Sequence, residues 1–269
     1  MKSDPNNHLR YAMEKTKLEV SAVNTAELDE SWSFANMRAS FTRVYIPLEG
    51  SAYVYVGEER TELLPGRIYV LPYGLSFTCA CPEYMKKIFF HFNLRCPQGN
   101  DFFEGVNSII ILENEEESAA RLSELYGRDD VASAVTVKAM LYGIISKAIE
   151  RMPESHEMIK EFSEYTEKAL RYIEGHINAR LTVSDISEAL FVSKQVLQKR
   201  FKTDVGKPIG KYIDERVMER AEQYLLSRRW SLSEISERLG FCDQFYFSRR
   251  FTETHGVSPM RFRKMHNVQ

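Results

Sequence analysis

The stretch "GFCDQFYFSRRFTETHGVSP", Gly240–Pro259, begins with a glycine and ends with a Gly-x-x-Pro. Between them it combines several aromatic residues with Gln, Ser and Arg side chains, which can form hydrogen bonds with flat polar groups. Phe247 and Phe251 are four residues apart and share one face of a helix, which predicts that they pack into a core. The opposite side carries Gln244, Phe245, Ser248 and Arg249. One helix is therefore predicted to have a core face and a second face with distinctive hydrogen-bonding chemistry.

The sequence preceding this helix is repeated earlier in the chain. "SLSEISERL" at 231–239 matches "TVSDISEAL" at 182–190. In each copy a hydroxyl residue, Ser231 or Thr182, is followed three positions later by an acid, Glu234 or Asp185, which predicts a capping box at a helix start. Each copy continues through a turn into a second helix, so the repeat predicts two helix-turn-helix units.

The second helix of the first copy has the same two-sided pattern. At an offset of 50, Leu197 aligns with Phe247 and Phe201 aligns with Phe251, which predicts that all four are buried. The aligned outward positions hold Gln195, Gln198 and Lys199. Glutamine suits adenine, the arginine fork suits guanine, and an apolar group suits the thymine methyl. The two helices are therefore predicted to contact base edges in double-stranded DNA.

A long amphipathic segment separates the two copies. "PIGKYIDERVMERAEQYLL" at 208–226 predicts one helix of about 18 residues, or about 27 Å. A rod of this length suits two recognition helices spaced by about one DNA turn, ~34 Å. Basic residues nearby are expected to contact phosphates and make binding salt-dependent. These are Lys202, Lys207, Arg228 and Arg229.

Charge divides the chain into an acidic part and a basic part. The chain of 269 residues has 36 Lys and Arg against 38 Asp and Glu, but from residue 168 onward the counts are 19 against 12. Only the basic part is expected to meet a polyanion. The length favours two domains. We predict an N-terminal domain at 1–152, a linker at 153–166 and a DNA-binding domain at 167–269.

Short segments typical of strands fill the region from Phe41 to Leu94. They are "FTRVYIPL" (41–48), "SAYVYVG" (51–57), "RIYVLPY" (67–73) and "KKIFFHFNL" (86–94). Pro65 and Gly66 predict a turn between two strands. The pattern becomes helical at 115–127 and 131–152, where the second helix has a broad apolar stripe. That stripe is expected to pack on the β unit, to form a homodimer interface, or both.

The segments 186–225 and 231–263, from "ISEALFVSKQVLQKRF" to "GFCDQFYFSRRFTETHGVSPMRFR", resemble the double helix-turn-helix domain of the AraC family of bacterial transcription regulators. The resemblance implies a regulator that is not an enzyme, works in the cytoplasm, forms a homodimer and contacts RNA polymerase. One departure is Phe191, which stands where the second copy has Gly240. The β unit resembles the cupin-like sensor domain of many members. The expected fold is therefore α+β, with an N-terminal cupin-like β-barrel or jelly roll and an all-α C-terminal domain.

The resemblance implies a small-molecule effector, a sugar or related metabolite, held inside the β unit. Strand aromatics and a strand histidine are the candidates for contacting it: Trp32, Tyr53, Tyr55, Phe89 and His91. Aromatic residues stack on sugar faces, although in strands they also serve as core. The stretch "PGRIYVLPYGLSFTCACPEY" at 65–84 contains no histidine, so we expect no catalytic metal and no cofactor.

Two alternatives stay open at this stage. A metal- or redox-sensing regulator would use Cys79, Cys81 and Cys96, although buried small thiols are also ordinary core residues. A cupin enzyme would need a cluster of carboxylate and histidine that the sequence lacks. The polar N-terminus and the lack of a spanning apolar run predict no membrane association.

Overall fold

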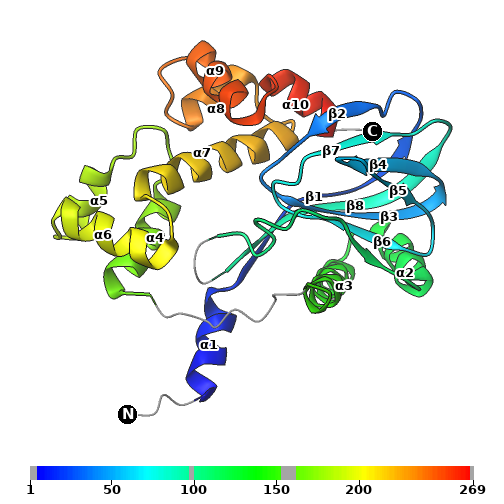
Figure 1. Cartoon of the computed structure of the whole chain (residues 1–269), viewed down its shortest axis with the longest axis horizontal. Coiled ribbons are helices and arrows are strands. Elements are labelled where there is room, and N and C mark those ends of the chain that lie inside the picture. The colour runs from blue at the N-terminus through cyan, green and yellow to red at the C-terminus, as the bar shows by residue number, and fades with distance from the viewer. Residues whose placement is uncertain (1–4, 97–99, 153–161, 267–269) are drawn as a thin grey trace. The chain divides into compact units, whose positions relative to one another are not determined.

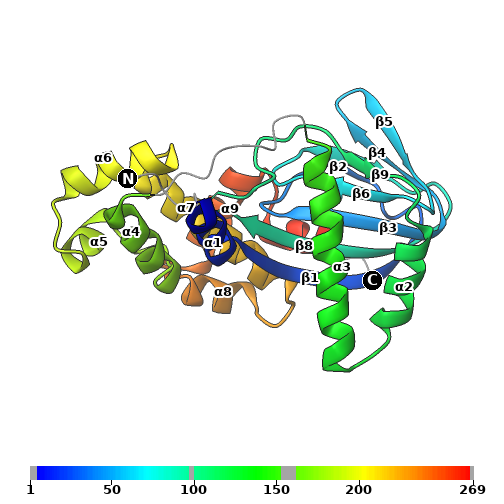
Figure 2. The same ribbon diagram turned by 90° about the horizontal axis from the view of Figure 1, so that it is seen from below.

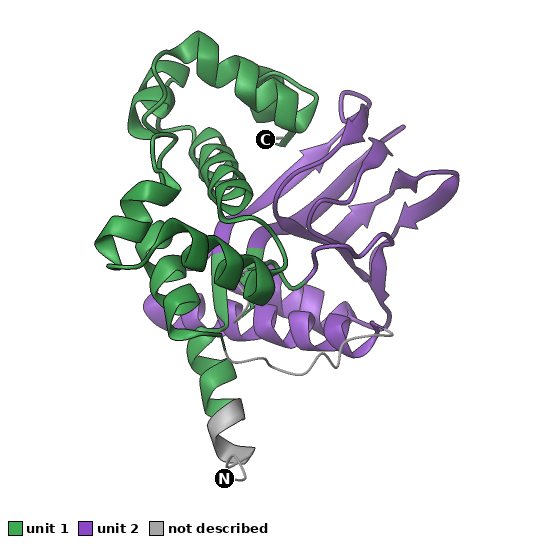
Figure 3. Ribbon diagram, turned by 60° about the vertical axis from the view of Figure 1, so that its left-hand side comes forward, with its two compact units in different colours: residues 1–19, 93–102, 159–266 green, residues 20–92, 103–158, 267–269 purple. Residues whose placement is uncertain are grey.

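The computed structural model describes residues 5–96, 100–152 and 162–266 (Figure 1). These residues form two compact units, which Figure 3 shows in different colours. The helical unit contains residues 5–19, 93–96, 100–102 and 162–266, and the β unit contains residues 20–92 and 103–152. No sequence pattern indicated that two short N-terminal segments belong with the C-terminal helices.

The predicted domain limits remain a prediction, because they concern which pieces fold independently. Two strands, β1 (Lys17–Leu28) and β8 (Met85–Arg95), begin in one unit and end in the other. Residues 153–161, most of the predicted linker, lie outside the described residues.

Among the described residues, the strands form two sheets. One has the order β1-β8-β3-β6-β9 and the other β2-β7-β4-β5. The pairs β3/β6, β3/β8, β6/β9, β2/β7, β4/β5 and β4/β7 are antiparallel. The remaining strands are β2 (Phe34–Met37), β3 (Thr42–Gly50), β4 (Ala52–Val56), β5 (Glu59–Leu63), β6 (Ile68–Leu71), β7 (Phe77–Ala80) and β9 (Ile110–Leu112).

The strands predicted at 41–48, 51–57, 67–73 and 86–94 are confirmed as β3, β4, β6 and β8. Gly66 has φ of 83°, in the left-handed region that glycine adopts readily, and lies in the predicted turn between β5 and β6. The cupin-like classification of this unit stays a prediction.

The two faces of the five-stranded sheet differ in chemistry. Tyr45 on β3 lies opposite Phe89 on β8, and side chains two residues apart share a face. Arg43 and Lys87 therefore lie on the same face as this pair, with Val44 on the other. The guanidinium of Arg43 is 5.0 Å from the ring centroid of Phe77 on β7, so the polar face is turned toward the second sheet.

Two helices of the β unit confirm the change to a helical period at residue 115, and both pack against its strands. They are α2 (Glu116–Tyr126) and α3 (Val131–Glu150), which contact each other, β3 and β9. Figure 2 shows α3 lying across the strands of this sheet. Leu141 and Ile144 are buried, whereas Val131 and Val135 are 80% and 62% exposed.

By length and composition, α3 is the one helix in the described part of the chain that reaches the level expected of a membrane span. The same test is passed by core helices of globular domains, and the buried side of α3 packs within the β unit.

The helical unit begins with α1 (Pro5–Lys15), which the sequence patterns did not predict. The C-terminal helices follow the predicted order of two short pairs around a longer helix (Figure 1). They are α4 (Glu164–Gly175), α5 (Val183–Ala189), α6 (Lys194–Val205), α7 (Ile209–Leu226), α8 (Leu232–Arg238), α9 (Gln244–His255) and α10 (Pro259–His266).

Candidate DNA-binding and effector sites

Both helix-turn-helix units begin with the predicted capping boxes. The hydroxyls of Thr182 and Ser231 accept hydrogen bonds from the backbone N–H groups of Asp185 and Glu234. Each acid in turn accepts a 2.8 Å bond from the backbone N–H of its hydroxyl partner. These reciprocal bonds satisfy N–H groups that a helix start otherwise leaves unpaired, so α5 and α8 begin at equivalent positions.

The turn of each helix-turn-helix unit contains one residue in the left-handed backbone conformation, but the residue type differs between the units. Gly240 has φ of 73° and Phe191 has φ of 52°. This conformation costs a residue with a Cβ about 1–2 kcal/mol. The Phe191 side chain is 97% exposed, so packing contributes little to offset the strain. The tight turn is thus retained despite the departure noted in the sequence.

The inward faces of α6 and α9 are buried as predicted. Leu197, Phe201, Phe247 and Phe251 are all 0% exposed. The Phe201 ring packs edge-on against Tyr212 with centroids 5.4 Å apart, and the Phe251 ring packs edge-on against Phe262 at 5.2 Å. This burial fixes which sides of the two helices remain available to a partner.

The candidate DNA contacts of the first unit all lie on the exposed side of α6. Gln195, Gln198 and Lys199 are exposed. Ser193 caps the helix by accepting a hydrogen bond from the backbone N–H of Val196, which holds the first turn that carries Gln195. Their contact with bases stays a prediction.

The second unit presents a more aromatic surface. On α9, Phe245 is 83% exposed and Arg249 is exposed, while Gln244 and Ser248 are half-buried. The Arg249 guanidinium lies 5.4 Å from the ring centroid of Tyr246, within cation–π range. This contact restrains the guanidinium on the surface of the helix.

The predicted spacer is confirmed as α7, a single helix of 18 residues. It contacts α6 of the first unit and α8 of the second (Figure 1). Three of its buried residues are charged, which its apolar stripe did not indicate: Arg216, Glu219 and Glu222. Arg216 donates to Glu174 on α4 at 2.9 Å, and Glu222 lies 2.5 Å from Nε2 of His255 on α9. These pairs join α7 to α4 and to α9 of the second helix-turn-helix unit.

The structure brings together three of the five candidate effector residues inside the β unit. Trp32, Phe89 and His91 are buried, and the rings of Phe89 and His91 have centroids 4.9 Å apart. The Lys87 amino group links them, at 4.3 Å from the Trp32 ring centroid and 6.0 Å from that of Phe89. The ring of Tyr45 completes the cluster, 3.4 Å from the same amino group.

Lys87 was not among the candidates from the sequence. Its side chain is buried, and burial lowers the pKa of Lys87 to about 7. The sequence "KKIFFHFNL" could have indicated this position, because Lys87, Phe89 and His91 are two residues apart and therefore lie on the same face of a strand. Arg43, also fully buried, adds a second cation to this face.

Tyr53 and Tyr55 lie apart from this cluster. On β4 they alternate with the buried residues Ala52 and Val54 and are themselves half-buried, which places them on the outer face of the sheet. The Tyr53 hydroxyl donates to Glu62 at 3.2 Å. The strand period alone would have separated these two tyrosines from an interior site.

Two of the three thiols of the alternative hypothesis, Cys79 and Cys81, are poorly suited to thiolate chemistry. Cys79 and Cys81 are buried in the β unit, and burial raises the pKa of the Cys79 thiol to about 11. Metal binding and redox exchange require the thiolate, which a raised pKa disfavours. Within residues 5–96, 100–152 and 162–266, no group of three or more His, Cys, Asp or Glu side chains is arranged to hold a metal ion.

Comparison with known proteins agrees with the repeated helix pairs. A family model described as a helix-turn-helix domain matches residues 186–265. The Msm operon regulatory protein of Streptococcus mutans is 24% identical over 92% of both chains. The C-terminal part of the chain is a helix-turn-helix domain of the AraC type. It is a DNA-binding regulator, and the cupin-enzyme alternative is set aside because its relatives are regulators.

Other similar proteins match over different lengths. The xylose operon regulatory protein of Escherichia coli is 30% identical over 37% of this chain and 26% of its own length. A solved structure of ToxT from Vibrio cholerae is similar over 92% of this chain and 98% of that chain, with a TM-score of 0.57 and 16% identity. ToxT with a bound unsaturated fatty acid gives a TM-score of 0.52 at 14% identity, over 93% and 95% of the two chains. The two-domain α+β fold is therefore that of ToxT.

Proposed function

We propose that this regulator binds its operator through two major-groove segments, one for each recognition helix. The observation that supports this is the repeated layout of α6 and α9, which bury apolar residues fully at aligned positions and leave the opposite side of each helix exposed or half-buried. The proposed base contacts are Gln195, Gln198 and Lys199 from the first unit and Gln244, Phe245, Ser248 and Arg249 from the second.

Selection of bound sequences from random DNA tests the proposal. The purified full-length chain is expected to select two short conserved segments whose centres are about 10 base pairs apart. Affinity for the selected DNA should fall steeply between about 50 and 200 mM salt. Selection of a single segment would show that only one helix contacts bases.

We propose further that the interior of the β unit holds the effector, a sugar or a related metabolite. The supporting observation is a buried lysine, Lys87, among the rings of Trp32, Tyr45 and Phe89, with His91 beside them. Rings provide stacking surfaces and the lysine provides hydrogen-bond donors, the combination expected of a polar small-molecule site. A relative named for a xylose operon favours a sugar, whereas ToxT is known with a fatty acid.

A thermal-shift screen of sugars, sugar acids and fatty acids against the full-length chain tests this site. A true effector at 100 times its dissociation constant should stabilise the protein by about 2.7 kcal/mol. Lys87→Met should abolish the shift, and Tyr55→Phe on the outer face is the matched control. A shift that survives Lys87→Met would place the effector elsewhere.

The protein is proposed to be a cytoplasmic homodimer that also contacts RNA polymerase. For the dimer, the supporting observation is the exposed apolar side of α3, with Val131, Val135 and Tyr142 at 80%, 62% and 44% exposure. Val135→Asp should shift sedimentation at micromolar concentration from dimer to monomer. Leu141 packs within its own unit and is unsuitable for this test.

A further inference from the structure

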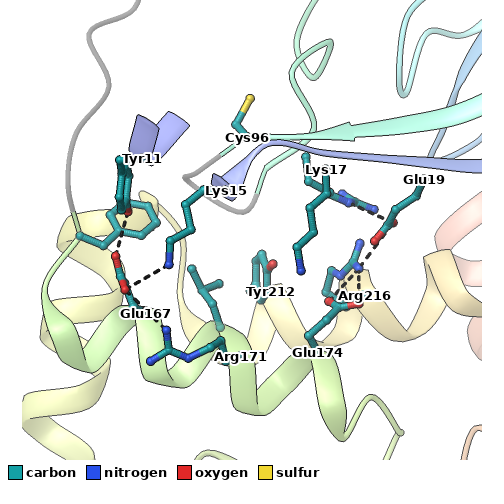
Figure 4. A pocket seen from close by; sticks show the side chains of 13 residues that line it. Tyr11, Lys15, Lys17, Glu19, Cys96, Glu167, Arg171, Glu174, Tyr212 and Arg216 are labelled. Atoms are coloured by element: carbon teal, nitrogen blue, oxygen red, sulfur yellow. Dashed lines mark hydrogen bonds and ion pairs between the residues drawn. The ribbon is translucent and has the colours of Figure 1, made fainter. Parts of the chain in front are cut away.

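A cavity of about 120 Å³ lies within the helical unit, and no residue of α6 or α9 lines it (Figure 4). Its walls come from α1, the start of β1, the end of β8, α4 and α7. An engineered apolar cavity of roughly 150 Å³ holds one benzene, so this volume suits a small organic molecule.

Cations outnumber carboxylates in the cavity wall. Five cationic side chains face three carboxylates: Lys15, Lys17, Arg95, Arg171 and Arg216 against Glu19, Glu167 and Glu174. A fourth carboxylate, Glu219, lies outside the lining and accepts hydrogen bonds from both Arg95 and Arg216. Even with this residue counted, one positive charge is left over.

Two of the three wall carboxylates accept hydrogen bonds from neighbouring side chains, whereas Oε2 of Glu19 is in ion-pair range of Arg95 and has no hydrogen-bond partner in the described part of the chain. Glu167 accepts hydrogen bonds from the Tyr11 hydroxyl at 2.9 Å and from Lys15 at 3.2 Å. Glu174 accepts from Arg216 at 2.9 Å. Because Glu167 and Glu174 are paired and the described wall keeps more cations than carboxylates, a cationic ligand is disfavoured by repulsion.

Lys17 carries the excess charge. It extends from β1 toward α4 and α7, and its amino group ends near Tyr212, Glu174 and Arg216 (Figure 4). Among the described residues no carboxylate lies within ion-pair distance of it, in contrast to Lys15. In addition, Nε of Arg216 is buried without a hydrogen-bond partner in the described part of the chain. Two donors are therefore available at one end of the cavity.

Apolar and aromatic surface completes the wall. Phe162 is 9% exposed, Tyr212 is 6% exposed, and both line the cavity with Leu170 and Tyr11. Such surface favours a compact apolar body such as a ring. The donors at one end of the cavity suit a negatively charged group, and the apolar rest of the wall suits an apolar body, so the matching ligand is a small organic anion.

We propose that this cavity is a second ligand site, which binds a small monoanion with a ring-sized apolar body. Lys17 and Nε of Arg216 would donate to its carboxylate, while Phe162, Leu170 and Tyr212 would contact its ring. The site goes beyond the proposed effector site in the β unit and does not depend on it. Because α4 and α7 both contact α6, occupancy acts on the helices that support the first recognition helix.

Benzoate is the probe that tests this site, in calorimetric titration of the full-length protein without DNA. Benzyl alcohol supplies the ring without the charge, and inorganic phosphate supplies the charge without the ring. We expect benzoate to bind and the other two to bind at least tenfold more weakly. Lys17→Gln should weaken benzoate binding about tenfold, since hydrogen bonds to charged groups are worth about 1.4 kcal/mol or more, and Lys17→Arg should retain it.

Lys264→Gln on α10 is the matched control, because it also removes one exposed lysine from the helical unit. It should leave benzoate affinity unchanged. Equal binding of benzyl alcohol, equal binding of phosphate, absence of benzoate binding, or unchanged affinity in Lys17→Gln would each overturn the proposal. None of these results bears on DNA recognition, so failure here is separable from failure of the proposed function.

Discussion

The first and second helix-turn-helix units share their capping boxes, their fully buried helix positions and their C-terminal glycines, Gly206 and Gly256, both with positive φ. Their exposed faces differ. The first is polar, with Gln198 and Lys199, and the second is aromatic, with Phe245 83% exposed. The comparison teaches that packing fixes the inward pattern of such a repeat, while the outward positions are free to diverge toward different DNA segments.

The largest expected effect comes from the shared cores. Phe201→Ala and Phe251→Ala each remove a fully buried ring and should each lower the free energy of unfolding by about 3–5 kcal/mol. Urea denaturation of the full-length chain, followed by far-UV circular dichroism, measures both. If one variant loses less than about 1 kcal/mol, the two cores are not equivalent and the comparison fails.

The next largest effect distinguishes a proposed base contact on α9 from a proposed phosphate contact outside the recognition helices. Arg249→Ala should weaken binding to selected operator DNA by about 1–3 kcal/mol and relax preference at one base position. Arg229→Ala removes an exposed arginine just after α7 and should weaken operator and random DNA modestly and equally. Fluorescence anisotropy with both DNAs measures this. Equal losses for the two variants would mean that α9 does not contact bases there.

Helix capping gives a smaller and symmetric effect. Thr182→Ala and Ser231→Ala each remove one side of a capping box and should each cost about 1 kcal/mol of unfolding free energy. Thermal unfolding of both variants checks the symmetry. Ser233→Ala, at an exposed position inside α8, is the control and should change stability by less than about 0.5 kcal/mol.

The turns give the smallest effect, and its sign should differ between the units. Phe191→Gly should stabilise the protein by about 0.5–1 kcal/mol, because it relieves a left-handed backbone and removes no packed side chain. Gly240→Ala should destabilise by about 1 kcal/mol, since its Cβ would sit 3.4 Å from Cβ of Asn178 at φ of 73°. Changes of the same sign would show that the turns are not equivalent.

Periodicity predicted the parts of the molecule where one residue type repeats at a fixed interval. It identified both helix pairs, the spacer helix, four strands and the helices α2 and α3. It gave no signal for α1 or for the crossing of β1 and β8 into the helical unit, because long-range contacts join segments that are distant in sequence. Of the effector candidates, Trp32, Phe89 and His91 lie together, whereas Tyr53 and Tyr55 lie on an outer face. Lys87 was missed because composition ranks lysine as a surface residue.

The continuous helix α7 also constrains how the operator can evolve. Each residue added to an α-helix rotates everything beyond it by about 100° and advances it by about 1.5 Å, whereas each base pair rotates the groove by about 36° over about 3.4 Å. A one-residue insertion would turn the second recognition helix away from the duplex, and a full helical turn would restore the angle but not the distance. If the two recognition helices bind two DNA segments as proposed, the length of α7 fixes the spacing of these segments, so new operators are expected to arise through base changes within the segments and not through altered spacing.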